Sequence, residues 1–309
     1  MPVKKIEVDD DNSGRRLDNF LLSVYKNVPK SKIYNIIRKG EVRINSGRVK
    51  PHRKIELGDI IRIPPYLDSE PTIDRHEPQA SSKLINELKN QIIFEDQNYI
   101  ILNKPHGIAV HGGTKSFVGV ISVMRSLYDN NIDLCHRIDK ETSGCLVLSK
   151  NKKSNRHFNE SIVNKNVKKK YLAIVKGHLS KTLKVNSSIE KSFDTQTKSF
   201  ISETGKKANS VFRPISKLNA ASLVEVEIST GRTHQIRLQG QEIGHPVVND
   251  DKYGDREFNK KDILKKNKRM GLHSQIIEFK DQNNKTIKVK AEPDSCLLYT
   301  SDAADEVVS

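Results

Sequence analysis

The sequence predicts an α+β protein with a small N-terminal unit and a larger unit built on a largely antiparallel sheet. Near the N-terminus, apolar residues recur at the spacing of an amphipathic helix: Leu17, Phe20, Leu21 and Tyr25. Beyond residue 91, runs typical of strands outnumber helical patterns, as in residues 222–229, where Val and Ile alternate with Glu. Long helical stretches are few, and no repeat of fixed period is visible.

The N-terminal unit is predicted to span residues 1–64 and to contain two short helices followed by two short strands. Ser31 is placed to cap the second helix, and Gly40 is expected to end it. The strands are expected at residues 41–45 and 59–64. The unit is basic, so it either presents a surface for phosphates or has an ordinary solvated helical surface.

The rest of the chain divides into a linker, a second domain and a tail. Residues 65–90 are polar and include Pro71 and Pro78, which predicts a linker. The larger domain follows over residues 91–295, with strands expected at residues 98–105 and 145–148. Residues 296–309 contain neither Lys nor Arg. We interpret this atypical tail as a translation artefact that replaces a native C-terminal helix.

The composition narrows the class of protein. A chain of 309 residues can form two domains, and its 54 Lys and Arg against 38 Asp and Glu give a net charge of +16, which favours a polyanionic partner. Three cysteines without paired spacing indicate a reducing compartment. The sequence lacks an apolar run long enough for a membrane span and a secretory signal at its N-terminus. We therefore expect a cytoplasmic monomer with no membrane partner.

The most informative motif is HRIDKETSG, from His136 to Gly144. Asp139 lies just before a Thr-Ser-Gly turn, and the apolar run at residues 145–148 predicts a buried strand directly after that turn. A carboxylate on a tight loop beside a buried strand can be held rigid and partly desolvated, as a nucleophile needs. The alternative is that Asp139 only caps the turn, which Asp often does.

The motif resembles the active-site motif of the RluA-type pseudouridine synthases: His-Arg, an apolar residue, Asp, two variable residues, two Ser or Thr, and Gly. Further blocks resemble the same family in the same order, at residues 102–113, 169–177, 230–238 and 244–258. Several ordered blocks are more specific than one short pattern. The GDREF and His-Gly-Gly sequences are most similar to the RluC branch, which modifies large-subunit ribosomal RNA. The resemblance implies a mixed sheet with a cleft along one face.

The resemblance also implies roles for single residues. Asp139 is the catalytic aspartate, Arg237 pairs with it and keeps it ionised, and Tyr171 offers a stacking face for the base and a hydroxyl for proton transfer. Without the resemblance, Arg237 is a solvated helix residue and Tyr171 a half-buried strand residue. Leu238 is expected to pack under the base. Gln239 stands where the family commonly has histidine, which weakens any expected RNA contact there.

Two groups of residues are expected to bind RNA. In or beside the family motifs, four side chains suit contacts to the RNA backbone: Arg137, Lys140, Arg232 and His234. The N-terminal unit resembles the small RNA-binding module named after bacterial ribosomal protein S-four. Its two short helices carry the basic residues expected to meet phosphates: Arg15, Arg16, Lys30, Lys32, Arg38 and Lys39. The target uridine must lie in a loop or be flipped out.

No spacing typical of a metal site or of a glycine-rich phosphate loop is present, so we expect neither a metal nor a nucleotide cofactor. The leading hypothesis is a cofactor-independent isomerase of uridines in large-subunit ribosomal RNA. One alternative is a noncatalytic RNA-binding or ribosome-assembly factor with the same fold. Others are an RluD-like set of ribosomal uridines or a transfer-RNA substrate. The intact set of Asp139, Tyr171 and Arg237 favours the enzyme.

Overall fold

The computed structural model describes residues 3–25, 28–67, 80–112, 118–191, 199–260, 269–294 and 297. The chain divides into two compact units, Met1–Glu77 and Pro78–Ser309. Within the described ranges, no helix combines the length and apolar character needed to cross a bilayer.

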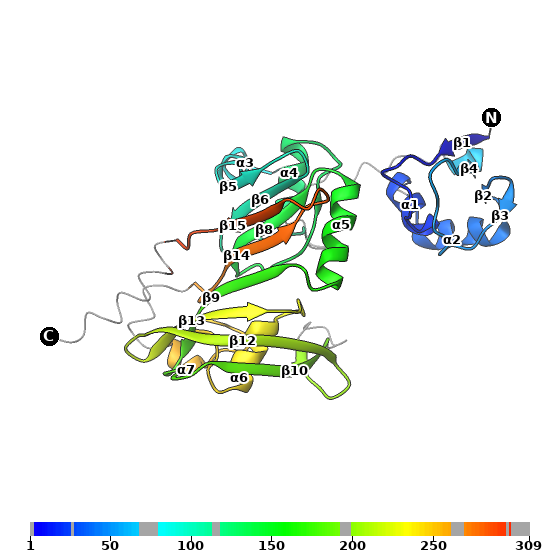
Figure 1. Ribbon diagram of the computed structural model, residues 1–309. Helices are drawn as coiled ribbons and strands as arrows, with labels where there is room; N and C mark the ends of the chain where they lie inside the picture. Colours follow the sequence, from blue (N-terminus) through cyan, green and yellow to red (C-terminus); the bar gives the residue numbers. More distant parts are fainter. Residues whose placement is uncertain are drawn as a thin grey trace. The chain divides into compact units, whose positions relative to one another are not determined.

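The first unit combines two helices with a four-stranded antiparallel sheet of order β1-β4-β2-β3 (Figure 1). Its elements are β1 (Lys4–Glu7), α1 (Leu17–Val24), α2 (Lys30–Lys39), β2 (Arg43–Ile44), β3 (Gly47–Arg48), β4 (Ile60–Ile63) and the 3-10 helix η1 (Pro65–Leu67). The apolar residues that predicted the first helix are buried in one core with Ile33 and Ile37 of α2. Burial of these two apolar helix faces against the sheet stabilises the unit.

Helix α2 begins earlier than predicted. Pro29 occupies the N-cap position with φ −56° and ψ 140°, so Ser31 lies inside the first turn and does not cap the helix. Proline suits the start of a helix because the first amide groups have no partner within the helix. Gly40 ends the helix as predicted, in a left-handed conformation with φ 76°.

The second unit is an α+β fold around an 11-stranded mixed sheet, as predicted. Nine strands form the path β11-β10-β12-β13-β9-β14-β8-β6-β5, while β15 pairs with β14 and β7 pairs with β8. Among the described strands only β14 and β8 pair in parallel. Its elements are α3 (Ser82–Lys89), β5 (Ile92–Glu95), β6 (Tyr99–Lys104), α4 (Val120–Leu127), β7 (Asp133–Leu134), β8 (Ser143–Ser149), α5 (Lys152–Val163), β9 (Lys168–Lys176), β10 (Leu183–Lys191), β11 (Ser199–Ile201), β12 (Lys206–Lys217), β13 (Ala221–Ile228), α6 (Gln235–Glu242), α7 (Arg256–Asn259), β14 (Leu272–Lys280) and β15 (Thr286–Lys290).

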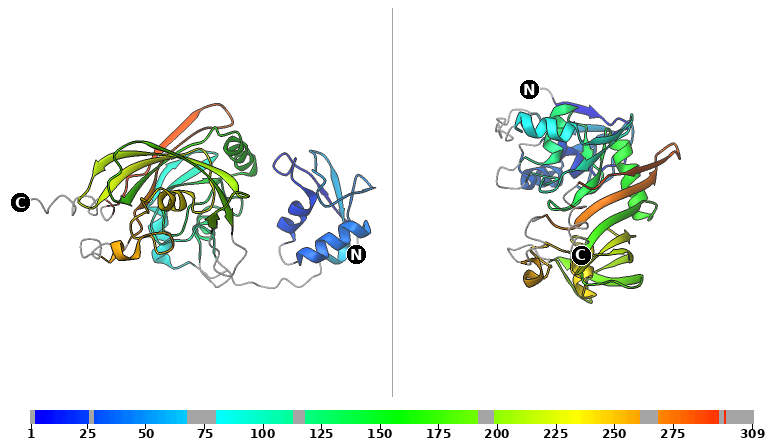
Figure 2. Two further views of the ribbon diagram at one scale, coloured as in Figure 1. Left: turned by 90° about the horizontal axis from the view of Figure 1, so that it is seen from below. Right: turned by 90° about the vertical axis from the view of Figure 1, so that its left-hand side faces the viewer.

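Helices cover both faces of the sheet around β6 and β8 (Figure 1). Leu146 and Leu148 of β8 belong to the core formed with α3 and α4, whereas Cys145 and Val147 pack with Phe158 of α5. Strand β8 is therefore buried at every position, which explains its continuous apolar sequence. In the other half, the curved strands β10, β12 and β13 arch over α6 (Figure 2).

One predicted boundary, that of the linker, differs from the structure. Helix α3 lies within residues 65–90, the range predicted as a linker, and its Leu88 is buried in the core shared with α4. The helix therefore belongs to the second unit, while residues 68–79 of the predicted linker lie outside the described residues. In the tail 296–309, Leu297 is described and is buried beside Val248 and Phe258. The other residues of this tail lie outside the described part of the chain.

The parallel contact between β8 and β14 requires a glycine. Gly144 has φ +101°, and a Cβ at this position would lie 2.2 Å from the carbonyl oxygen of Ser274 in β14. We expect Gly144→Ala to lower the free energy of unfolding by about 3 kcal/mol, because backbone strain and a steric clash add together. Urea denaturation measures this loss.

Gly244→Ala is the matched control, since Gly244 has φ +77° but no atom within 4 Å of the point where a Cβ would lie. Its loss should be about 1 kcal/mol, from backbone strain alone. Equal losses for the two variants would show that the close approach of Ser274 does not determine the residue at position 144.

Candidate active site

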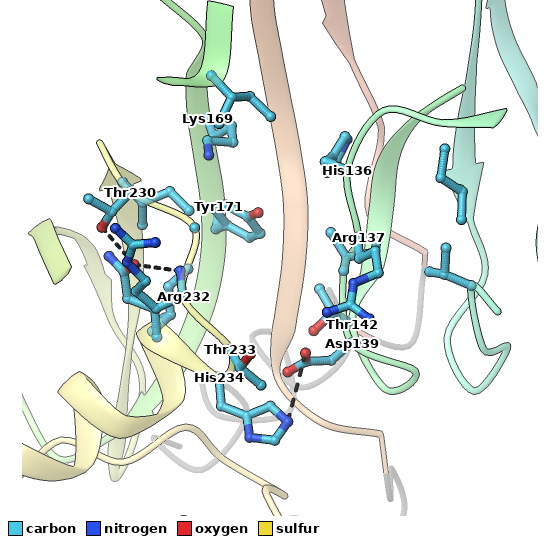
Figure 3. Close-up of a pocket in the computed structure, with 18 of the residues that line it drawn as sticks. His136, Arg137, Asp139, Thr142, Lys169, Tyr171, Thr230, Arg232, Thr233 and His234 are labelled. Carbon is cyan, nitrogen blue, oxygen red and sulfur yellow. Dashed lines mark hydrogen bonds and ion pairs between the residues drawn. The ribbon is translucent and has the colours of Figure 1, made fainter. Parts of the chain in front are cut away.

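A cavity of about 900 Å³ lies in the second unit. It is lined by the segment before β8, the start of β9 and the loop between β13 and α6 (Figure 3). Asp139, Tyr171 and Arg237 all line it, although Asp139 and Arg237 are 98 positions apart in the chain. The fold thus brings the three residues predicted to carry the chemistry to one place.

Backbone contacts fix the loop that carries Asp139. The amide of Thr142 donates to the carbonyl of Asp139 at 3.1 Å, and the amide of Gly107 donates to the carbonyl of Lys140 at 3.0 Å. The fully buried ammonium of Lys104 also donates to the carbonyl of Lys140, at 3.1 Å. These bonds hold the main chain still, while the Asp139 side chain remains 27% exposed.

Lys104 is a residue that the sequence interpretation missed. Its ammonium donates to three backbone carbonyls, those of Pro105 at 2.7 Å, Ile108 at 2.9 Å and Lys140. Burial lowers the pKa of Lys104 to about 7. The signal was present in the sequence, because a lysine that ends an apolar strand is unusual unless its charge is needed.

His136 anchors the root of the same loop. Its Nε2 accepts a hydrogen bond from the amide of Val147 in β8 at 3.1 Å, and its ring stacks on Phe158 at a centroid distance of 5.9 Å. Burial lowers the pKa of His136 to about 3, so the ring is neutral near pH 7 and can accept this bond. The imidazole therefore ties the segment before Asp139 to the most buried strand of the sheet.

Arg237 joins two carboxylates. Its Nη1 donates to Oδ2 of Asp139 at 2.9 Å, while Nε and Nη2 donate to the two carboxylate oxygens of Asp250 at 2.6 and 2.7 Å. The side chain of Arg237 is 6% exposed, so it is not the solvated helix residue of the alternative interpretation. A guanidinium held by two bonds to one carboxylate has a fixed plane, which directs its remaining nitrogen.

Asp250 is a second residue that the sequence interpretation missed. Besides the two bonds from Arg237, one of its oxygens accepts from the amides of Lys252 at 2.9 Å and Tyr253 at 3.1 Å. Burial alone would raise the pKa of Asp250, but the hydrogen bonds and charge of Arg237, together with the amides of Lys252 and Tyr253, lower that pKa below its usual value. Its position after two adjacent valines was the available signal, since a carboxylate beside buried residues needs a partner.

The guanidinium of Arg237 stays protonated. Burial alone would lower the pKa of its guanidinium, but the hydrogen bonds and charge of Asp250, together with the charge of Asp139, raise that pKa above its usual value. A permanently charged donor therefore faces the Asp139 carboxylate at all physiological pH values.

Tyr171 lies on β9 with its ring on the cavity and 7% of its surface exposed. Burial raises the pKa of Tyr171 to about 12, so its phenol stays protonated near neutral pH. The ring can stack on a base. The hydroxyl can donate a hydrogen bond, but it accepts a proton poorly while it remains neutral.

His234 lies beside Asp139 on the cavity (Figure 3). Its Nε2 is 3.9 Å from Oδ1 of Asp139, and its Nδ1 shares a hydrogen bond with the hydroxyl of Tyr253 at 2.9 Å. Burial lowers the pKa of His234, although the charge of Asp139 opposes this shift. His234 adopts a left-handed backbone conformation with φ 56°, which places its ring ahead of α6.

The other predicted contacts fall into two groups. Arg137, Lys140, Arg232 and His234 line the cavity. Leu238 does not, because it packs against Ile189, Ala208 and Tyr253 instead. Successive helix residues point about 100° apart, so a residue next to Arg237 faces elsewhere. Leu238 therefore lies outside the cavity in which it was expected to pack under the base.

Gln239 is also internal. It is fully buried, and its side chain accepts from the hydroxyl of Ser210 at 2.6 Å and donates to the carbonyl of Ala208 at 3.0 Å. Gln239, the residue that departs from the family pattern, therefore does not line the cavity.

The cavity is cationic. Among the described residues, two carboxylates line it, those of Asp133 and Asp139. The lysines and arginines that line it are more numerous: Arg137, Lys140, Lys165, Lys169, Arg232 and Arg237. A concave surface with this balance attracts polyanions such as RNA.

The six basic residues predicted to bind RNA on the first unit lie on or beside α1 and α2. Lys30, Arg38 and Lys39 are exposed, while Arg15 and Lys32 are half-buried. Arg16 is exposed as well, but its guanidinium donates twice to the buried carboxylate of Asp18, at 3.1 and 2.6 Å. The Nε and Nη2 edge of the Arg16 guanidinium is thus held by Asp18.

Comparison with known proteins agrees with this geometry. Residues 98–242 match the RNA pseudouridylate synthase family model, and residues 15–61 match the S4 domain model. The human RNA pseudouridylate synthase domain-containing proteins 4 and 1 share the fold, with TM-scores of 0.60 and 0.59. They are 23% and 22% identical to this chain, and the alignments cover 72% and 71% of it and 96% and 90% of the human chains.

Two bacterial relatives are more similar. Ribosomal large subunit pseudouridine synthase C of Haemophilus influenzae is 41% identical, over 94% of this chain and 92% of the relative. The protein of the same name from Pasteurella multocida is 40% identical, over 94% of this chain and 91% of the relative. With this similarity along nearly its whole length, the chain belongs to the RNA pseudouridylate synthase family and carries an S4 domain at its N-terminal end.

Proposed function

We propose that this enzyme converts uridines of large-subunit ribosomal RNA to pseudouridines, with Asp139 as the catalytic carboxylate. The observation that carries the proposal is the 2.9 Å bond from Arg237 to Asp139 in a cationic cavity of about 900 Å³. The names of the bacterial relatives support the class of RNA.

The reaction breaks the bond between uracil N1 and ribose C1′, turns the base, and joins its C5 to C1′. As C1′ loses the base it becomes electron-poor, so a nearby carboxylate stabilises it or bonds to it. Asp139 either attacks C1′ directly or removes a ribose proton to give a glycal-like intermediate. Both routes require an ionised carboxylate, which the permanently charged Arg237 favours.

The proton on C5 must leave, and N1 must gain one, before the product forms. The high pKa of Tyr171 makes its neutral phenol a donor near pH 7, so we assign it to stacking and hydrogen bonding on the base. Removal of the C5 proton then falls to a group that is ionised at that stage, for which the departing Asp139 carboxylate is suitably placed.

The S4 domain supports an RNA partner that spans more than one nucleotide. We propose that its basic residues bind phosphates beyond the cavity, so that two attachment points on one RNA raise the local concentration of the target uridine. We also propose that the enzyme acts in the cytoplasm as a monomer. Light scattering on the purified chain measures its mass against the 35.1 kDa of one copy.

The catalytic role of Asp139 is tested by Asp139→Asn. Turnover should fall by more than about 1000-fold while RNA affinity stays within severalfold, because the shape is kept and the charge is lost. Asp133→Asn changes another carboxylate on the cavity and should keep turnover within severalfold. Retained turnover with lost binding in Asp139→Asn would contradict the assigned role.

The substrate is tested by mapping pseudouridines in cells that lack and then regain the gene. Specific large-subunit sites should disappear and return. Loss confined to transfer RNA would replace the proposed substrate, and no loss anywhere would favour the noncatalytic factor.

Asp250 should act through Arg237. Asp250→Asn removes the paired charge of a buried guanidinium, so we expect about 3 kcal/mol less stability in urea and at least about 100-fold slower turnover. The neighbouring exposed Asp251 provides the control, since Asp251→Asn should change neither quantity appreciably. Full activity in Asp250→Asn would show that the bidentate bonds to Arg237 are dispensable.

The role of the S4 domain is tested by removing residues 1–65. Each lost phosphate contact should reduce the slope of log affinity against log salt by about 0.7 for single-stranded RNA. Binding should therefore weaken and become less dependent on salt, while turnover at saturating RNA persists. An unchanged slope would mean that the domain does not contact phosphates.

A further inference from the structure

Lys169 is a buried cation on the wall of the cavity. It lies on β9, two residues before Tyr171, and 7% of its surface is exposed. Its neighbours Lys168 and Lys170 point to the other face of the strand and pair with Glu278 and Glu225. Lys169 alone of the three faces the cavity (Figure 3).

The ammonium of Lys169 has no carboxylate or hydrogen-bond acceptor among the described residues, in contrast to Lys104. Burial lowers the pKa of Lys169 to about 8, and the positive charge of Arg232 contributes to this shift. Two cations held near each other in a partly dry cavity repel one another. Such an arrangement is stabilised when an anion binds between them.

The position of Lys169 suits an anion on the same RNA as the target uridine. Alternate residues of a strand lie about 7 Å apart, so Lys169 is one step beyond the ring of Tyr171. In Figure 3, Lys169 lies at the top, Tyr171 lies below it, and Asp139 lies further down. Gly231, next to Arg232, lies close to the ammonium, because a Cβ at Gly231 would be 3.4 Å from Nζ of Lys169.

We propose that Lys169, together with Arg232, binds a backbone phosphate next to the uridine whose ribose meets Asp139. A phosphate fits better than a uracil carbonyl, because two adjacent cations call for a full negative charge. The contact positions the ribose relative to Asp139 and Tyr171. The proposal rests on the proposed function for the identity of the RNA, but its test reads binding as well as turnover.

The free charge of Lys169 gives the contact a pH dependence. Other charged and titratable groups line the same cavity: His111, Asp133, His136, Arg137, Asp139 and Lys140 before β8, Lys165 after α5, Tyr171 on β9, Arg232 and His234 before α6, and Arg237 on α6. The pKa values of His136, about 3, and Tyr171, about 12, keep both uncharged between pH 7 and pH 9.5. Lys169 is charged below its pKa and loses its charge as the pH rises through about 8.

The test uses the full chain and an unmodified transcript of large-subunit ribosomal RNA. At pH 7, Lys169→Met should weaken binding about tenfold and reduce the salt slope by about 0.7, the loss expected for one phosphate contact. Lys168→Met is the control, because Lys168 is an adjacent exposed lysine on the other face, and it should change affinity less than twofold. An affinity loss with an unchanged salt slope would assign Lys169 to the uracil base and overturn the phosphate contact.

The ratio of wild-type to Lys169→Met affinity should fall severalfold between pH 7 and pH 9.5, since the wild type loses its ammonium charge over that range. A ratio that stays constant with pH would contradict the proposal.

Thermal unfolding separates binding from a structural role. An unpaired buried ammonium destabilises a fold, so Lys169→Met should melt at the same temperature as the wild type or higher. A lower melting temperature with unchanged RNA affinity would make Lys169 a structural residue. If the transcript proves not to be a substrate, Asp139→Asn and the wild type will be equally inactive, whereas failure at Lys169 alone leaves the turnover of the wild type intact.

Discussion

The contact between Arg237 and its two carboxylates determines the geometry of the whole site. Asp250 binds Nε and Nη2 and fixes the plane of the guanidinium, which leaves Nη1 to meet Asp139. Asp250 is fully enclosed, whereas Asp139 opens on the cavity, so the two carboxylates have different tasks. The buried one fixes the position of a permanent cation, and the open one is the carboxylate that we propose as catalytic. The ion pair between Arg237 and Asp139 is thus formed before any substrate binds.

The remainder of the second unit holds the Asp139 loop against this pair. Lys104 supports the loop from inside through carbonyl oxygens, and His136 fastens its root to β8. Strand β8 is itself covered on both faces, and Gly144 lets β14 approach it closely. Lys104 and His136, which are hydrogen-bonded and buried, thus hold the loop in place, while other basic side chains line the cavity.

Sequence patterns predicted the parts of the fold in which local and tertiary preferences agree. The buried β8, the alternation along β13 and the glycine that ends α2 are of this kind. Helix α3 was missed because most of its residues are polar and only Leu88 is fully buried. Within the site, the motifs predicted which residues gather, and the cavity contains Asp139 and Arg237 together. The apolar neighbours of Lys104 and Asp250 indicated burial, but the partners of these two residues and the burial of Lys169 depend on contacts between distant segments or on strand register, which spacing along one chain does not reveal. Leu238 packs outside the cavity because adjacent helix residues point in different directions.

A double-mutant cycle in turnover tests most directly whether Asp250 serves Asp139 only by holding Arg237. Rates at saturating RNA are compared for Arg237→Lys, Asp250→Asn and the variant that carries both changes. Lysine keeps the positive charge but cannot make the bidentate bonds to Asp250. If Asp250 acts through the guanidinium, the double variant should be about as slow as Arg237→Lys alone. Losses that multiply in the double variant would show that Asp250 acts independently of Arg237, and would contradict the account of one connected site.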